Sequence, residues 1–67
     1  MYGETVKRLR LLSGLTQKQL ANNAKVALNT VKNLESGKLK NPTLSTLIKI
    51  ADALGVSVIL GEVLHNE

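Results

Sequence analysis

Apolar residues recur at intervals of three and four along four stretches of this chain, and this spacing predicts four helices. We expect them to cover about residues 3–13, 17–24, 28–37 and 44–54. Connections of three to five residues would join them, so the pattern favours an all-α bundle of four or five short helices.

Capping residues set the ends of these segments. Thr16 with Gln19 three positions later forms a capping-box pattern, and Thr43 after Pro42 can cap the last helix. Gly37 and Gly55 stand where left-handed C-terminal residues are expected. We therefore predict that the second helix begins after Thr16 and the fourth after Thr43, and that the third and fourth end at Gly37 and Gly55.

The apolar stripes indicate which side of each helix faces the core. In the first helix the inward positions are Val6, Leu9 and Arg10, extended by Leu12 or Leu11. In the second they are Leu20, Ala21 and Ala24, and in the fourth Leu44, Leu47, Ile48, Ala51 and Leu54.

The C-terminal stretch 56–64 fits two structures. Ser57 could cap a fifth helix, but Gly61 would then lie inside it at a cost of about 1 kcal/mol. As a strand, the stretch places Val56, Val58 and Leu60 on one face and leaves an edge that needs a partner. The β-branched residues favour the strand, and the same strand of a second subunit is then the expected partner at a dimer interface.

Composition narrows the functions that this chain can perform. A chain of 67 residues buries only about 60% of its unfolded surface, so a partner subunit would help to stabilise it. With no cysteine and one histidine, His65, we expect no disulfide, metal site or cofactor. No stretch is long enough to span a membrane, and no credible acid–base pair exists, so we expect a cytoplasmic protein that is not an enzyme.

Positive charge is concentrated in one part of the chain. All nine bases lie between Lys7 and Lys49 together with one acid, Glu35, a formal charge of +8 for that region. Such a field suits a polyanion such as DNA, although a solvated surface also needs charge.

The predicted third helix has two different faces. On a helical wheel Ala27, Val31 and Leu34 cluster on one side, and Leu28 lies at the margin. The opposite side carries Asn29, Lys32 and Asn33. An amphipathic helix of this kind packs its apolar side inward and presents amides and an ammonium group outward.

Those outward groups can read DNA bases. An Asn side chain can exchange two hydrogen bonds with adenine in the major groove, and an apolar group suits the thymine methyl. Asn29 and Asn33 lie one turn apart, so we expect them, with Leu28 and Lys32, to contact bases. A helix face of Asn and Lys is also typical of an ordinary solvent-exposed surface. The pattern alone therefore fits both a DNA-reading face and a solvated one.

The surrounding elements favour DNA binding. Two short helices over about residues 17–36, the second with the polar outer face, form the helix-turn-helix arrangement, in which the second helix enters the major groove. Gln17 at the start of the first of these helices and Lys38 and Lys40 after the second would then bind phosphates.

The sequence also resembles a known family. The resemblance rests on Gly3, Val6, Lys7, Leu9, Arg10, Gly14-Leu15-Thr16-Gln17, Leu20-Ala21, Val31, Leu34-Glu35, Gly37-Lys38, Pro42, Leu47, Ala51 and Ala53-Leu54-Gly55-Val56-Ser57. These positions are similar to the Cro/C1-type (Xre-like) helix-turn-helix domain of lambdoid repressors, and they span nearly all of residues 1–67.

The resemblance implies a lambda-repressor-like fold, an operator in double-stranded DNA, and homodimers. It implies that residues at Leu28, Asn29 and Asn33 read bases and that those at Gln17, Lys38 and Lys40 lie along the backbone. It also implies an ion pair between Arg10 and Glu35 that is structural.

Two departures from the family bear on function. Many relatives have Ser or Thr where Ala27 stands, and Ala27 cannot cap the third helix, which should cost about 1 kcal/mol. The stretch from Val56 to Leu60 resembles the terminal strand of HipB-type antitoxins, which pairs across their dimer.

We therefore expect an autoregulating repressor, antitoxin-like, with a kinase-like toxin encoded alongside as a partner. A phage Cro-like repressor and a restriction controller are the alternatives of the same class. A protein-interaction module without DNA specificity is the alternative of another class.

Overall fold

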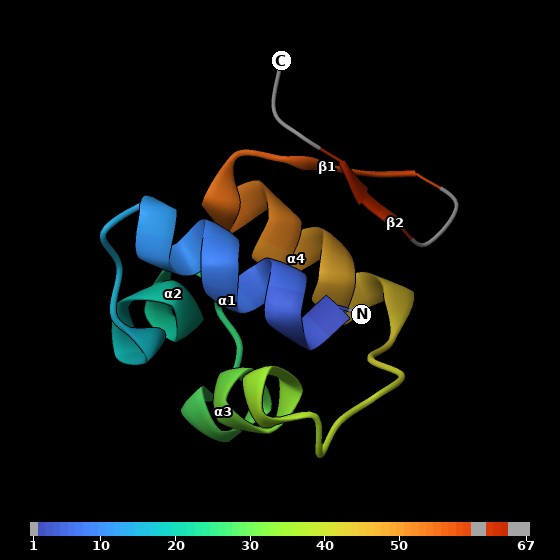
Figure 1. Cartoon of the computed structure of the whole chain (residues 1–67), viewed down its shortest axis with the longest axis horizontal. Helices are drawn as coiled ribbons and strands as arrows, with labels where there is room; N and C mark the ends of the chain where they lie inside the picture. The colour runs from blue at the N-terminus through green and yellow to red at the C-terminus, as the bar shows by residue number, and fades with distance from the viewer. Residues whose placement is uncertain (1, 60–61, 65–67) are drawn as a thin grey trace.

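A computed structural model describes residues 2–59 and 62–64 of the chain. Within them it holds four helices and two short strands, coloured from blue to red along the chain in Figure 1. In order these are α1 (Tyr2–Leu12), α2 (Gln17–Ala24), α3 (Leu28–Ser36), α4 (Leu44–Leu54), β1 (Ser57–Ile59) and β2 (Glu62–Leu64). The predicted four-helix bundle is confirmed.

The helix ends lie where their capping chemistry requires. The Thr16 hydroxyl accepts a 3.0 Å hydrogen bond from the Gln19 amide, and the Gln19 side chain accepts a 2.9 Å bond from the Thr16 amide. Thr43 caps α4 by accepting from the Thr46 amide at 3.1 Å. These three side-chain acceptors satisfy backbone amides that a helix start would otherwise leave unpaired.

The turn between α2 and α3 uses an unexpected residue. Lys25 ends α2 in the left-handed conformation, with φ 59°, and its amide donates to the carbonyls of Ala21 and Asn22. A non-glycine residue pays a steric cost there. Gly37 and Gly55 occupy the same conformation after α3 and α4, as their type predicts.

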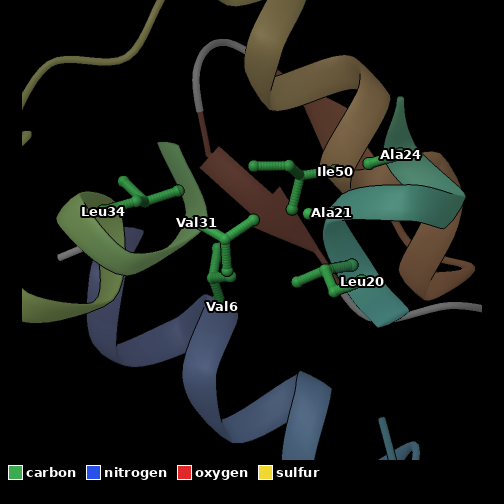
Figure 2. Packing of buried hydrophobic residues seen from close by; sticks show 7 residues of the cluster. All are labelled: Val6, Leu20, Ala21, Ala24, Val31, Leu34 and Ile50. Atoms are coloured by element: carbon green, nitrogen blue, oxygen red, sulfur yellow. The ribbon is translucent and has the colours of Figure 1, made fainter. Parts of the chain in front are cut away.

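Every helix contributes to one hydrophobic core. Figure 2 shows side chains from the four helices converging on the space between α1, α2, α3 and α4. The cluster consists of Val6, Leu20, Ala21, Ala24, Val31, Leu34 and Ile50. The predicted inward stripes of α2 and α3 supply five of these residues.

The predicted inward faces of α1 and α4 need correction. Leu11 and Leu12 are 58% and 78% exposed, so the core-facing stripe of α1 ends at Arg10. In α4, Leu44 and Ile48 are 59% and 45% exposed, and Ile50 takes the buried position beside Leu47 and Ala51. Because α4 is apolar on more than one side, its sequence period could not decide which side meets the other helices.

Close backbone packing joins α1 to α3. A methyl group at Gly3 would collide with the Leu34 carbonyl oxygen, so only glycine allows this approach. The contact lies beside the site at which Arg10 meets Glu35, and it fixes the distance between the two helices.

The C-terminal strand pairs within its own chain. β1 and β2 run antiparallel with Ser57 opposite Leu64, Val58 opposite Val63 and Ile59 opposite Glu62. β1 follows α4, β2 contacts α1, and Figure 1 shows the hairpin on the side of α1 and α4 that is remote from α3. The prediction of a strand is confirmed, whereas the inference that it lacks a partner within the chain is wrong.

Candidate nucleic-acid interface

The outward face of α3 carries the predicted base-reading residues in different environments. Asn29 and Lys32 are exposed, and Asn33 is half-buried. Leu28 is also half-buried and packs against the core cluster. Part of the Leu28 side chain therefore holds α3 in place, and only the rest is open to a ligand.

The start of α3 differs from the sequence expectation in one respect. Ala27 is exposed, so the prediction that it lies inward with Val31 and Leu34 is wrong. It stands at the N-cap with φ −68° and ψ 146°, and its side chain makes no capping hydrogen bond. The first turn of α3 is therefore held without the side-chain acceptor that Thr16 and Thr43 give to α2 and α4.

An enclosed ion pair ties α1 to α3. Arg10 Nε donates to Glu35 Oε2 at 2.7 Å, and Nη2 donates to Oε1 at 2.9 Å. The two side chains are only 9% and 4% exposed. A bidentate, charge-assisted contact of this kind fixes both distance and orientation, and it is the pair that the family resemblance implies.

The pair shifts the acidities of both partners. Burial alone would raise the pKa of Glu35, but the hydrogen bonds from Arg10 and Gln17 and the charges of Arg10 and Lys7 outweigh it, so this pKa is lowered from 4.5. The hydrogen bond with Glu35 raises the pKa of Arg10, against the effect of burial. Both groups therefore stay charged at neutral pH.

Gln17 brings a third helix into this network. Its Nε2 donates to Glu35 Oε1 at 3.1 Å, and Arg10 Nη1 donates to the Leu15 carbonyl just before α2 at 2.8 Å. The carboxylate of Glu35 thus connects α1, α2 and α3. The sequence pattern does not reveal the contact between Gln17 and Glu35, because the two residues belong to different helices and neither is part of an apolar stripe.

The loop after α3 carries the two predicted phosphate-binding lysines. Lys38 and Lys40 are exposed, while Leu39 between them packs against the core cluster. The Leu39 amide donates to the Asn33 carbonyl at 2.9 Å. The loop is therefore anchored to α3, and both lysines follow its C-terminal end in the chain.

Three residues are predicted at a dimer interface: Val56, Val58 and Leu60. Val56 is 8% exposed and buried in its own chain, so it is not a free surface residue. Val58 lies in β1 opposite Val63, and Leu60 lies outside the described residues. The strand that was expected to need a second subunit already has a partner, because β2 occupies one of its edges.

The described residues were also compared with what a membrane-spanning helix and a metal site require. None of their helices is both long enough and apolar enough to cross a membrane. Among them no three His, Cys, Asp or Glu residues lie close enough together to hold a metal ion.

Two helices joined by a tight turn, with a polar face on the second, define a helix-turn-helix protein. The Helix-turn-helix family matches this chain over residues 6–60, which is more than half of its length. The chain therefore belongs to the Cro/C1-type helix-turn-helix family of DNA-binding regulators.

Similar proteins include a phage repressor and a bacterial regulator. The immunity repressor protein of Bacillus phage phi105 is 42% identical over 62 residues, which are 90% of this chain and 42% of that protein. The HTH-type transcriptional regulator y4dJ of Sinorhizobium fredii (strain NBRC 101917 / NGR234), whose function is not characterised, is 39% identical over 57 residues, 85% of this chain and 73% of that protein. The chain thus spans less than half of the phage repressor.

Solved structures show the same fold. SinR, described as the master regulator for biofilm formation and crystallised in complex with DNA, superposes with a TM-score of 0.82 at 32% identity, covering 85% of this chain and 90% of the SinR chain. A complex of SinR with SinI gives a TM-score of 0.81 at 32% identity, covering 85% of this chain and 55% of that chain.

Proposed function

We propose that residues 1–67 form one sequence-specific domain that binds double-stranded DNA and represses transcription, with α3 in the major groove. One observation carries this proposal. The outward face of α3 presents exposed Asn29 and Lys32, while its inward face is fixed by the core and by the bond of Glu35 to Arg10 and Gln17. A reading helix needs such a rigid support, since base hydrogen bonds depend on position.

The residues divide into two kinds of DNA contact. Base edges would be read by Leu28, Asn29, Lys32 and Asn33. Phosphates would be bound by Gln17, Lys38 and Lys40. The bond to Glu35 takes one hydrogen of the Gln17 amide, so its second hydrogen is available to a phosphate oxygen.

The relatives support the class of function. SinR shares this fold and is crystallised with DNA, and the phage phi105 relative is an immunity repressor. A repressor of this kind acts in the cytoplasm, where it meets the DNA. It reads a palindrome as a two-fold dimer, with half-sites about 34 Å apart.

The finer assignment of the repressor depends on its genetic neighbours. The sequence favours an antitoxin because its strand-like tail resembles the HipB strand that pairs across a dimer, but β1 pairs with β2 in the same chain. That reason for expecting a kinase-like toxin therefore falls away. A phage-type repressor with its own gene as target accounts equally well for the site, as does a restriction controller.

Selection from genomic fragments at physiological salt, followed by footprinting, tests the proposal. We expect protection of a palindrome beside the gene for this protein, and the neighbouring reading frame would then separate an antitoxin from a phage or restriction regulator. Flat affinity across sequences, with only the salt dependence of any polycation, would instead favour a protein-interaction module.

Two substitutions separate base reading from phosphate binding. We expect Asn29→Ala to cost about 1–3 kcal/mol on the selected site and to relax the preference at one base pair. Lys38→Ala should weaken binding to all sequences alike and lower the salt slope by about one. Titrations on the selected site and on a scrambled site measure both effects, and a base preference that survives substitution of both Asn29 and Asn33 would contradict the assignment.

A further inference from the structure

The proposed reading helix contains no arginine. The sequence has two arginines, Arg8 and Arg10, and both are on α1. The guanidinium of Arg10 is already held by Glu35 and by the carbonyl of Leu15. Arginine bound to guanine is the commonest specific contact in the major groove. Because α3 cannot make this contact, the bases that it reads depend on the amide and apolar side chains of its outward face.

The outward side chains of α3 form two rows along the helix. Leu28 and Lys32 are four residues apart in one row, and Asn29 and Asn33 are four residues apart in the other. In helix-turn-helix proteins the N-terminal residues of the second helix contact the base edges. Leu28 and Asn29 are the first two residues of α3, and Asn29 is exposed, whereas Asn33 is half-buried. The amide best placed to read a base is therefore that of Asn29.

The amide of Asn29 distinguishes adenine from guanine. Its nitrogen donates hydrogen bonds and its oxygen accepts them. In the major groove adenine offers the complementary pair, an acceptor at N7 and a donor at N6. Guanine offers two acceptors, N7 and O6, so the oxygen of the amide would face a second oxygen with no proton between them. An amide at this position therefore favours adenine.

The neighbouring Leu28 adds an apolar contact whose position is fixed. Leu28 is half-buried and packs against the core cluster, so the exposed part of its side chain is held at the start of α3. Thymine presents a methyl group in the major groove, whereas cytosine presents an amino group. Contact with Leu28 removes the methyl group from water, which is favourable, but would leave the amino group without a hydrogen bond. Leu28 therefore favours thymine.

We infer that Asn29 reads an adenine and that Leu28 contacts the methyl group of a nearby thymine, so each half-site has A·T pairs beneath the N-terminal end of α3. This inference rests on the proposed function and names the bases bound at that same site. Lys32 is the one cation in α3 and suits a guanine or a phosphate, so the preference for A·T is confined to the pairs beneath Leu28 and Asn29.

Modified bases test the inference without altering the protein. The analogue 7-deazaadenine lacks the N7 acceptor, N6-methyladenine has lost one hydrogen of the amino group, and uracil lacks the methyl group of thymine; all three still form base pairs. Each is placed in turn at every adenine or thymine of the half-site that genomic selection yields, and equilibrium binding is measured. We expect one adenine at which both modified adenines weaken binding about ten-fold. At a nearby thymine, uracil should weaken binding about three-fold.

Two variants assign the adenine effect to its side chain. In Asn29→Ala, 7-deazaadenine should weaken binding by less than about two-fold, because the amide that uses N7 is gone. Lys38→Ala is the matched control. It removes a proposed phosphate contact and lowers the affinity for both DNAs, but the ratio of about ten-fold between the unmodified and the modified site should remain.

The uracil effect is assigned in the same way with Leu28→Ala, which should bind the thymine and uracil sites equally. Circular dichroism checks that this variant folds, since Leu28 also packs against the core cluster. The comparison of thymine with uracil in the parent protein does not depend on that variant.

Three results would overturn the inference while leaving the proposed function intact, because a preferred site would still exist. They are a half-site that tolerates 7-deazaadenine at every adenine, a half-site made only of G·C pairs, and an adenine effect of equal size in Asn29→Ala and the parent. Equal affinity for all sequences would overturn the proposed function itself, and this inference with it.

Discussion

Glu35 accepts hydrogen bonds from Arg10 on α1 and Gln17 on α2 while it sits on α3, the proposed reading helix. A single carboxylate therefore holds together the three helices whose relative positions decide where Asn29 and Lys38 point. Removing one partner of an enclosed ion pair leaves a buried charge without compensation, which is strongly destabilising. Arg10 and Glu35 thus act on DNA binding through structure.

The lowered pKa of Glu35 predicts a specific dependence of stability on pH. We expect Glu35→Gln to lower the free energy of unfolding by on the order of 3 kcal/mol at pH 7. Because the pKa of Glu35 is lowered from 4.5 on folding, its stabilisation is complete above that pH and is lost as the pH falls through the folded value. Denaturant unfolding of both proteins between pH 7 and strongly acidic pH measures the difference, which should shrink below about pH 4.5. A difference that stays constant on acidification would show that the charge of Glu35 is not what stabilises the fold.

The close packing of α1 on α3 at Gly3 predicts that a larger residue there destabilises the fold. Gly3→Ala introduces a methyl group that collides with the Leu34 carbonyl oxygen, and backbone cannot move aside cheaply. We expect a loss of about 1–3 kcal/mol in the free energy of unfolding, although alanine is the better helix former. The neighbouring exposed variant Glu4→Ala should change stability by no more than about 0.5 kcal/mol. Equal stability of Gly3→Ala and the parent would mean that the two helices do not approach this closely.

The ends of the helices could be predicted from the sequence where nearby capping residues determine them. Thr16 and Thr43 start their helices, and Gly37 and Gly55 end theirs, because capping depends on residues that are close in the chain. Long-range packing is harder to predict, as α4 shows: Leu44 and Ile48 are as apolar as Leu47 and Ile50, and only the position of the other helices decides which pair is buried.

The sequence analysis did not predict strand β2 or the left-handed conformation of Lys25, because both depend on packing with other parts of the chain. β2 forms only by pairing with β1, so neither its three residues nor their spacing indicates a strand alone. Lys25 in the left-handed conformation is not a residue type that marks a turn, and the geometry of the turn between α2 and α3 imposes it. At the site, the pairing of Arg10 with Glu35 was predicted, but the bond from Gln17 was not.

The missing cap of α3 can be supplied. Ala27 already has the extended backbone of an N-cap and is exposed, so Ala27→Ser should place a hydroxyl near the Thr30 amide. We expect the free energy of unfolding to rise by about 1 kcal/mol, within the usual range of about 0.5–2 kcal/mol. Thr43→Ala, which removes a cap that is present, should lower it by a similar amount. Thermal unfolding of the two variants checks both signs, and a destabilised Ala27→Ser would show that α3 does not begin at Leu28.

At the scale of the whole molecule, the proposed reading helix and the C-terminal hairpin lie on different sides. Figure 1 shows α3 on one side of α1 and α4 and the hairpin on the other, so the reading face is free of the C-terminal strands. Nine bases lie between Lys7 and Lys49, the region that contains α2, α3 and the loop after it. The charge attracts any DNA, whereas the face of α3 would discriminate among sequences.

The ratio of two affinities tests this account most directly. Equilibrium binding at physiological salt should be measured on the palindrome that the genomic selection yields and on a scrambled fragment of the same composition. We predict that the palindrome binds at least about 10³ times more tightly, as specific DNA-binding proteins do, and that Asn29→Ala reduces this ratio. A ratio near one, with affinity falling steeply with salt on both fragments, would contradict the account and leave charge alone as the basis of binding.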